Sequence, residues 1–247
     1  LTPVTASHTI TQRTLNVTGF TGVDKVYYRS STATVTASDD RVIGDTLTIA
    51  SSATFADANV ARGTLGEVLN KTITVSGITL SSANDGGNYT LSTTTGTASA
   101  KITPLALTVT GTSVTPKTYD GNTTATLVGG ALGGVLTGDT VTLTQAGSFN
   151  DKNAGTGKTV TAADSLGGAQ AGNYNLIQPT GLTGTITAKP LTVTYTGVDK
   201  VYDGLDTATV NTSDNRITGD SLSIVRTANF TITNGEIHTC KTSRESD

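Results

Sequence analysis

The sequence contains no methionine, no tryptophan and a single cysteine, Cys240. One cysteine excludes an internal disulfide framework, so the fold must be held by packing and hydrogen bonds. No apolar run approaches the roughly 20 residues that a membrane-spanning helix requires, so we expect no membrane insertion. Because an initiating methionine is absent, we expect an excised segment or a processed product, whose N-terminus carries no information on targeting.

Charged and aromatic side chains are also sparse. Charged residues make up 14% of the chain, aromatic residues 4%, and the net charge is −3 at pH 7. This balance provides no basic surface for nucleic acid and no attraction to anionic lipid, so neither is an expected partner. Threonine and valine alternate along much of the chain, and both favour pleated strands over helices. The composition therefore predicts a mainly β protein.

The chain repeats itself. A segment that opens with Leu-x-Val-Thr and leads to a tyrosine occurs three times, and the tyrosines Tyr27, Tyr119 and Tyr202 lie 92 and 83 residues apart. Each copy continues to a Gly-Asp pair, at 44–45, 138–139 and 219–220, and then to a phenylalanine, at 55, 149 and 230. Self-similarity at a nearly fixed period is typical of an array, and arrays serve reach, spacing or multivalent contact.

The junctions between copies set the expected domain boundaries. The segment Ile10–Leu15 matches Ile186–Leu191, where one copy closes and the next opens. We therefore expect residues 1–12 to be the last strand of a preceding, truncated repeat. Repeat 1 then spans 13–103, repeat 2 spans 104–188, and repeat 3 spans 189–247. Repeat 3 is incomplete, because the sequence after Phe230 diverges from the other copies.

Period-two alternation within repeat 2 predicts about six short strands. They are centred on 105–109, 125–127, 141–143, 160–162, 174–176 and 182–186. Helix content should be low, with one short helix or turn at about 162–171. A core of this size is small, so neighbouring repeats are expected to stack directly on one another. In repeat 3, strands are expected at 191–195, 207–210 and 221–225, with disorder after 230 because no closing strand is evident.

Tyr-Asp-Gly is the most clearly defined motif that recurs in the sequence. It occurs as Tyr119-Asp120-Gly121 and as Tyr202-Asp203-Gly204, whereas repeat 1 has Tyr27-Tyr28-Arg29 at the same place. Asp-Gly favours a turn, because glycine accepts positive φ and the aspartate side chain can bond its own backbone two residues on. The tyrosine is expected to bury its ring and give its hydroxyl a backbone partner. An alternative is that Asp120, with Asp139 or Asp151, binds Ca²⁺.

Two further pairs recur. Asn88-Tyr89 and Asn173-Tyr174 each follow a glycine where a loop enters a late strand, which predicts an asparagine that caps the turn and a tyrosine that fills the core. Gly138-Asp139 belongs to the recurrent Gly-Asp pair described above. The segment from Gly155 to Thr159 resembles a phosphate-binding loop, but a strand and not a helix is expected to follow it. The longer counterpart of this segment in repeat 1 is interpreted as a tolerant hairpin tip.

The sequence shows no recognisable set of catalytic residues. The only histidines, His8 and His238, lie outside the complete repeats, and serine or threonine nucleophiles need a positioned base. Glutamate is limited to three positions, which gives little basis for a pair of catalytic carboxylates. We expect a protein that is not an enzyme and that uses no cofactor and no metal.

The motifs together resemble a known family. Lys189-Pro-Leu-Thr-Val-Thr, Lys200-Val-Tyr-Asp-Gly, Gly172-Asn-Tyr and Gly184-Thr-Ile-Thr-Ala-Lys are similar to the YDG repeats of large bacterial surface proteins. Those repeats are related to the MBG type and occur in filamentous-haemagglutinin-like adhesins. The resemblance implies export, a role as a stalk or adhesive module, and small β-grasp-like or sandwich-like units stacked as an elongated array. Tyr28-Arg29 and the tail after Phe230 depart from the pattern.

Two hypotheses follow. In the first, the chain is a non-enzymatic structural or adhesive segment of a secreted or cell-surface bacterial adhesin. Its partners would be neighbouring repeats of the same chain and a host or surface glycan or protein. In the second, it is a specific carbohydrate- or calcium-binding module of a surface protein. A spacer would have unpatterned polar surfaces, whereas a binder would gather exposed tyrosine and aspartate in one loop cluster.

Overall fold

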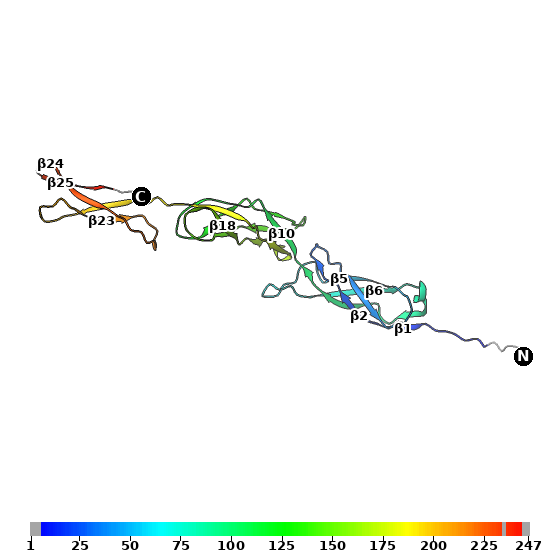
Figure 1. Ribbon diagram of the computed structural model, residues 1–247. Helices are drawn as coiled ribbons and strands as arrows, with labels where there is room; N and C mark the ends of the chain where they lie inside the picture. Colours follow the sequence, from blue (N-terminus) through cyan, green and yellow to red (C-terminus); the bar gives the residue numbers. More distant parts are fainter. Residues whose placement is uncertain (1–5, 234–235, 244–247) are drawn as a thin grey trace. The chain divides into compact units, whose positions relative to one another are not determined.

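The structure is a computed structural model, and it describes residues 6–233 and 236–243, with side chains as far as residue 231. The fold is mainly β, as the composition predicts, because strands dominate every repeat (Figure 1). Two short 3-10 helices, η1 (Asn84–Asn88) and η2 (Ala171–Asn173), interrupt the strands. Among the described residues no helix is long and apolar enough to cross a membrane. The helix or turn expected at 162–171 lies instead at η2.

Repeat 1 contains nine strands in four small sheets. Strands β5 and β6 lie side by side (Figure 1), and β6 also pairs antiparallel with β8. Strand β2 pairs antiparallel with β4, while β1 with β7 and β3 with β9 pair in parallel. The strands are β1 (Arg13–Leu15), β2 (Val17–Gly22), β3 (Lys25–Val26), β4 (Val35–Asp39), β5 (Ile49–Phe55), β6 (Lys71–Leu80), β7 (Tyr89–Leu91), β8 (Gly96–Ala100) and β9 (Ile102–Thr103).

Each of the six segments expected in repeat 2 overlaps a strand of the structure. These strands are β10 (Leu105–Thr110), β13 (Thr124–Ala125), β14 (Leu127–Val128), β16 (Thr142–Thr144), β18 (Gly155–Ala162), β20 (Tyr174–Ile177) and β21 (Leu182–Thr187). The pattern missed five further strands: β11 (Ser113–Val114), β12 (Lys117–Thr118), β15 (Ala131–Gly133), β17 (Gly147–Phe149) and β19 (Ser165–Gly167). Strands of two or three residues are too short to show an alternation, so periodicity alone does not find them.

One pairing recurs in both complete repeats and positions the site described below. In repeat 1 the opening strand β1 runs parallel to β7, with Arg13 opposite Tyr89. In repeat 2 the opening strand β10 runs parallel to β20, with Leu105 opposite Tyr174. The tyrosine of each Asn-Tyr pair therefore starts a strand that lies against the opening strand of its own repeat.

Repeat 3 differs from the expectation in two places. It contains β22 (Val193–Val198) paired with β23 (Thr209–Asp214), and β24 (Thr227–Thr233) paired with β25 (Glu236–Ser243). The expectation of disorder after residue 230 is wrong over these residues, because β25 supplies an antiparallel partner for β24. The strand expected at 221–225 does not form, and Val225 is exposed. Its counterpart β16 pairs with β19, a strand just before the Asn-Tyr pair that repeat 3 lacks.

The expected strand at the N-terminus is also not formed. Residues 6–12 are outside any strand, and Ile10 is 99% exposed; residues 1–5 lie outside the described residues. The matching Ile186 is buried on β21, between β12 and β18. Those two strands precede Ile186 in the same repeat, and no equivalent strands precede Ile10 in this sequence.

The chain forms two compact units that do not coincide with the sequence repeats. Unit 1 comprises residues 1–112, 129–145 and 164–179, and unit 2 comprises 113–128, 146–163 and 180–247. Repeat 2 is thus divided: β10, β15, β16, β19 and β20 belong to unit 1, and its remaining strands belong to unit 2. The repeat boundaries describe the period of the sequence, and each compact unit combines parts of two successive repeats.

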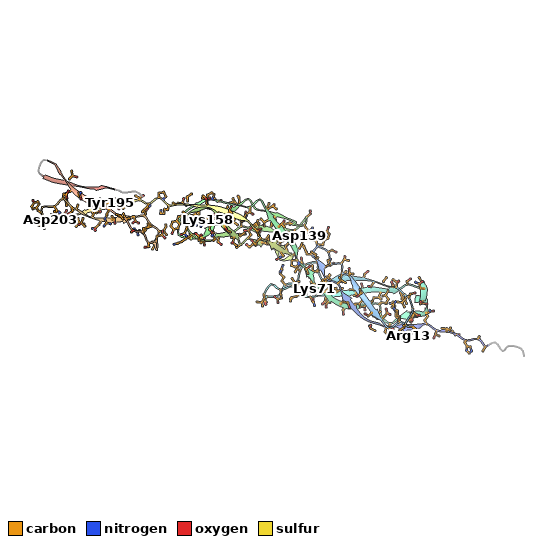
Figure 2. All side chains as sticks on the ribbon, viewed as in Figure 1. Arg13, Lys71, Asp139, Lys158, Tyr195 and Asp203 are labelled. Carbon is orange, nitrogen blue, oxygen red and sulfur yellow. The ribbon has the colours of Figure 1, made fainter. Side chains whose placement is uncertain are left out.

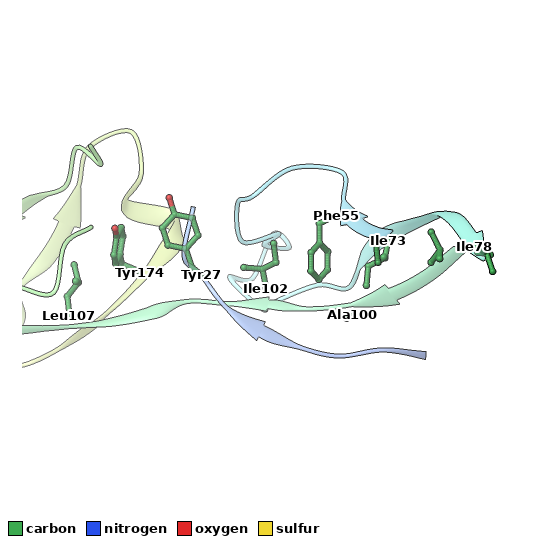
Figure 3. Close-up of a cluster of buried hydrophobic side chains, with 10 residues drawn as sticks. Tyr27, Phe55, Ile73, Ile78, Ala100, Ile102, Leu107 and Tyr174 are labelled. Carbon is green, nitrogen blue, oxygen red and sulfur yellow. The ribbon is translucent and has the colours of Figure 1, made fainter. Parts of the chain in front are cut away.

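Each compact unit has its own hydrophobic core. In unit 1, Ile73 and Ile102 of repeat 1 lie in one cluster with Leu107 of repeat 2, and all three are fully buried (Figure 3). The rings of Tyr27 and Tyr174 meet edge-to-face in this cluster, with centroids 5.5 Å apart. Unit 2 has a separate core of Ala125, Leu127, Phe149, Val160, Ala162 and Ile186. Burial of such side chains contributes about 1.5–3 kcal/mol each, so repeats 1 and 2 share part of their stabilisation.

Candidate functional site

The recurrent Gly-Asp pair forms the same tight turn in each repeat. In repeat 2 the Asp139 N–H donates to the Leu136 carbonyl at 3.0 Å, and Gly138 between them has φ +92°. A positive φ at this position of a turn favours glycine, because side chains with a Cβ clash there. The equivalent bonds join Asp45 to Val42 at 3.1 Å and Asp220 to Ile217 at 3.0 Å. The turn holds the aspartate carboxylate in one orientation.

The tyrosine of the Asn-Tyr pair binds this turn within its own repeat. The Tyr174 hydroxyl accepts from the Leu136 N–H at 3.1 Å and donates to Asp139 Oδ2 at 2.6 Å. In repeat 1 the Tyr89 hydroxyl accepts from the Val42 N–H at 3.0 Å and donates to the Asp45 carboxylate. Both rings are buried, as the sequence predicts. The hydroxyl therefore links the first and last residues of the turn.

A second tyrosine reaches the Asp139 carboxylate from the preceding repeat. The Tyr27 hydroxyl donates to Asp139 Oδ2 at 2.8 Å, and Arg29 Nε lies 3.0 Å from Oδ1. Arg29 also donates to the Thr137 carbonyl. The Asp139 side chain is only 2% exposed, so its charge is compensated by these donors and by Tyr174 in place of water. We call the contact of Tyr27 and Arg29 with Asp139 the first joint.

The electrostatics of the first joint favour neutral phenols. Burial, together with the hydrogen bond to the Asp139 carboxylate, raises the pKa of Tyr27 to about 12. Burial and the same carboxylate raise the pKa of Tyr174. A phenolate beside Asp139 would place two negative charges in a region with little water, which opposes ionisation.

A loop of repeat 1 completes the first joint. The Val60 N–H donates to Asn173 Oδ1 at 2.9 Å, and Asn173 Nδ2 donates to Asn59 Oδ1 at 3.0 Å. Arg62 donates to the carbonyls of Gly172 at 2.7 Å and Tyr174 at 3.1 Å. The loop between β5 and β6 is thus a contact segment and not merely a tolerant hairpin tip. Asn173 was expected to cap its own turn, but its amide binds the preceding repeat because its side chain is buried against this loop.

Repeats 2 and 3 are joined in the same way within unit 2. The Tyr119 hydroxyl donates to Asp220 Oδ1 at 2.6 Å, and Lys152 Nζ lies 3.5 Å from the same oxygen. Lys152 also lies over the Tyr119 ring, 5.9 Å from its centroid. The hydrogen bond to Asp220 raises the pKa of Tyr119. We call this contact the second joint; in both joints the expected backbone partner of the tyrosine is replaced by a carboxylate of the next repeat.

The two joints differ in the residue that follows the tyrosine by two positions. Gly121 has φ +81°, and a Cβ there would lie 2.8 Å from Ile217 Cγ2. Arg29 occupies the same position in repeat 1 and has φ +57°. Tyr28-Arg29 departs from the Tyr-Asp-Gly pattern, and Arg29 supplies the cation of the first joint, as Lys152 does in the second.

Comparison with known protein families agrees with this repeated architecture. The model of the YDG domain matches residues 11–96 and 103–181. The chain belongs to the YDG domain family. No curated protein and no solved structure matches the chain.

The turn that gives the YDG domain its motif is held by a lysine. Lys117 Nζ lies 2.7 Å from Asp120 Oδ1 and donates to the carbonyls of Asn122 at 3.0 Å and Thr124 at 3.1 Å. The Asn122 N–H donates to Asp120 Oδ1 at 3.1 Å, the local bond that the sequence predicts. The motif of repeat 3 has the same local contacts. The Leu205 N–H and Lys200 Nζ both donate to Asp203 Oδ1, and Gly204 has φ +79°.

The remaining candidate residues of these YDG domains have other roles. Tyr202 is 84% exposed and not buried as expected, and Asn88 is also exposed. Lys158 Nζ lies 2.7 Å from Asp151 Oδ1, and Lys71 makes the equivalent contact with Asp57 at 2.6 Å. Figure 2 labels both lysines. The segment from Gly155 is strand β18, so it is not a phosphate-binding loop.

Residues 6–231, over which side chains are described, contain no group of three or more histidine, cysteine, aspartate or glutamate side chains that could hold a metal ion. His8 is exposed, and the side chains of His238 and Cys240 lie outside the described residues.

Proposed function

We propose that the chain is a non-enzymatic structural segment of a secreted or cell-surface bacterial protein, working as a stalk or a multivalent contact module. One observation carries this proposal. The Tyr-Asp-Gly position of one repeat donates a tyrosine hydroxyl to the Gly-Asp carboxylate of the next, from Tyr27 to Asp139 and from Tyr119 to Asp220. The most distinctive residues of the repeat are used to join repeats.

The energetics of the joints suit a segment that holds its neighbours. A hydrogen bond to a charged group contributes about 1.5–3 kcal/mol, and Asp139 accepts two from tyrosines in addition to its ion pair with Arg29. Removing a partner from a buried charge leaves that charge uncompensated, which is costly. Such joints oppose separation of successive repeats, so the principal partners are neighbouring repeats of the same chain.

A catalytic function is not part of the proposal. The ion pairs of the described residues lie in the joints, in lysine-bracketed turns or in local pairs such as Asp39 with Arg41, so a substrate would have to compete with these contacts. The resemblance to repeats of bacterial adhesins supports export to the cell surface or medium, and the near absence of cysteine is compatible with it. A host or surface glycan or protein is the ligand class for a contact role.

The alternative, a calcium- or carbohydrate-binding module, has less support. The carboxylates nominated for calcium are already paired: Asp120 with Lys117, Asp151 with Lys158, and Asp139 with Arg29 and two tyrosines. A cation would have to displace a lysine or arginine at each of them. We therefore advance the structural role alone.

Single-molecule force spectroscopy tests this role. The chain is held by its two ends, and Asp139→Asn is compared with Asp45→Asn. Asp45 is the matched control, since it occupies the same turn but binds Tyr89 of its own repeat. We expect Asp139→Asn to lower the force at which unit 1 opens, and Asp45→Asn to have a smaller effect.

Equal forces for wild type and Asp139→Asn would contradict a joint that resists separation of the repeats. Tight binding of one chain to a single glycan or matrix protein, undiminished by the loss of the joints, would contradict a mainly structural role. Binding that grows steeply with the number of chains on a bead would instead support multivalent contact.

A further inference from the structure

A groove of about 480 Å³ lies beside the second joint in unit 2. Its lining combines apolar and polar side chains, among them Tyr119, Lys152, Asn153, Leu191, Ile217 and Asp220. The same place in repeats 1 and 2 is occupied by the strand that begins with the Asn-Tyr tyrosine. That strand runs parallel to the opening strand, with Leu105 opposite Tyr174 in repeat 2. Lys189 and Leu191 are the counterparts of Leu105 and Leu107, and β22, which follows them, pairs with β23 alone among the described strands.

The turn at the floor of the groove has the groups that bind such a tyrosine. In repeats 1 and 2 the tyrosine hydroxyl accepts from the first N–H of the turn, that of Val42 or Leu136. The equivalent N–H of Ile217 has no hydrogen-bond acceptor in the described part of the chain. Asp220 Oδ1 accepts the hydrogen bond of the Tyr119 hydroxyl and forms the ion pair with Lys152. Within the same part of the chain no donor contacts the other carboxylate oxygen, Oδ2.

The wall of the groove has the groups that bind the asparagine. In the first joint, Asn59 Oδ1 and the Val60 N–H hold the amide of Asn173. Asn153 and Ala154 are their counterparts, because the Asn153 N–H donates to Asp151 just as the Asn59 N–H donates to Asp57. Both line the groove; the Asn153 amide contacts Asp151 as the Asn59 amide contacts Asp57, and over the described residues the Ala154 N–H has no hydrogen-bond partner.

We propose that this groove binds an extended peptide of the sequence Gly-Asn-Tyr-x-Leu, which adds as a parallel strand beside Leu191. Its tyrosine hydroxyl accepts from the Ile217 N–H and donates to Asp220, and its asparagine amide binds Asn153 and the Ala154 N–H. Strand addition to an exposed edge, with pockets for alternate side chains, is an established mode of peptide recognition. This inference goes beyond the structural role, since it assigns a binding site to repeat 3.

The occupant that we assign to the groove is a segment of a separate polypeptide. The sequence after Phe230 contains no tyrosine, and both Asn-Tyr pairs of the chain lie at the start of paired strands, β7 and β20. A separate chain with an unpaired Asn-Tyr segment of this family has the chemistry that the groove lacks. The observed pairing in repeats 1 and 2 fixes the direction of the strand and the position of its tyrosine.

The probe is a fluorescent peptide with the sequence of residues 170–178, Gln-Ala-Gly-Asn-Tyr-Asn-Leu-Ile-Gln. Its anisotropy is measured against the full 247-residue chain, and amide NMR shifts are recorded in parallel. We expect saturable binding, with the largest amide shifts at Ala154 and Ile217. Replacing the peptide tyrosine by phenylalanine, or Asp220 by Asn in the chain, should weaken binding tenfold or more, because each removes a hydrogen bond to a charged group.

The matched control is Asp45→Asn, which alters the same turn of repeat 1, where Tyr89 already occupies the site. It should leave peptide affinity unchanged. The proposal is overturned by the absence of saturable binding, by equal affinity of the tyrosine and phenylalanine peptides, or by shifts confined to unit 1. Self-association of the chain through this groove without peptide binding would also overturn it, and sedimentation of wild type and Asp220→Asn detects that outcome. The amide shifts of wild type keep the test valid if Asp220→Asn folds poorly.

Discussion

The first joint predicts that Asp139→Asn destabilises two repeats at once. The substitution keeps the shape of the side chain but removes its charge: the amide oxygen can still accept both tyrosine hydroxyls, whereas the amide NH2 faces Arg29 and cannot pair with it. A hydrogen bond to a neutral acceptor is weaker than one to a charged acceptor by about 1 kcal/mol, so the two tyrosine bonds together lose about 2 kcal/mol. The ion pair adds at most about 1 kcal/mol, because the Arg29 side chain is 47% exposed. The expected destabilisation is therefore about 3 kcal/mol.

Hydrogen exchange locates this loss. A change of about 3 kcal/mol corresponds to roughly 100-fold faster exchange of amides that open with unit 1. The informative amides are those of Lys25 and Tyr27 in repeat 1 and of β20 in repeat 2. Asp45→Asn serves as the control, and should accelerate exchange in β7 more than in β20, because Asp45 binds Tyr89 of its own repeat. The reasoning fails if Asp139→Asn accelerates β20 but leaves Lys25 and Tyr27 unchanged, since the contact between repeats would then carry no free energy.

Four further outcomes are expected. In urea titrations, Gly121→Val should destabilise unit 2 by about 1–3 kcal/mol, because Gly121 has φ +81° and a Cβ there would contact Ile217. Gly197→Val is the control and should be nearly neutral, because Gly197 has no positive φ and no atom lies close to its Cβ position. The contribution of Tyr27 to the stability of unit 1 should be constant below pH 10 and should be lost as the pH rises toward 12, because folding favours the protonated phenol, whose pKa is raised to about 12; Tyr27→Phe should flatten this alkaline part of the profile. Lys117→Met should lower the free energy of unfolding of unit 2 by about 1–2 kcal/mol, because Asp120 and the turn carbonyls lose the lysine that binds them. An unchanged thermal midpoint would contradict this role of the lysine. Melting curves recorded with Ca²⁺ and with a chelator should coincide, because the candidate carboxylates are already paired; a large Ca²⁺-dependent rise would refute this.

Local features of the fold could be predicted from the sequence, because their causes are local. The positive φ of Gly121 and Gly204 and the bond from Asp120 to the backbone two residues on follow from the chemistry of Asp-Gly alone. The burial of Tyr89 and Tyr174 follows from their place at the start of a strand. The longer strands of repeat 2 follow from the alternation of apolar and polar side chains.

The joints could not be predicted, because a period shows which positions are equivalent but not which copy each position contacts. Tyr27, Tyr119 and Tyr202 are equivalent in sequence, yet the first is buried in a joint, the second is half-buried and the third is 84% exposed. Arg29 and Lys152 provide the cations of the two joints from different places in the repeat. Nothing in the alignment of the copies marks them as equivalent.

The offset between repeats and compact units gives the joint its physical role. Tyr27 and Phe55 of repeat 1 share one core with Leu107 and Tyr174 of repeat 2, so unit 1 cannot unfold without exposing parts of both repeats (Figure 3). Two repeats joined only at their surfaces would separate at the cost of a few polar contacts. Here separation also exposes Leu107 and Tyr174, at about 1.5–3 kcal/mol for each fully buried side chain. The contact between the YDG domains of repeats 1 and 2 is therefore part of a folded core, and the Asp139 carboxylate binds the two tyrosines that enter it.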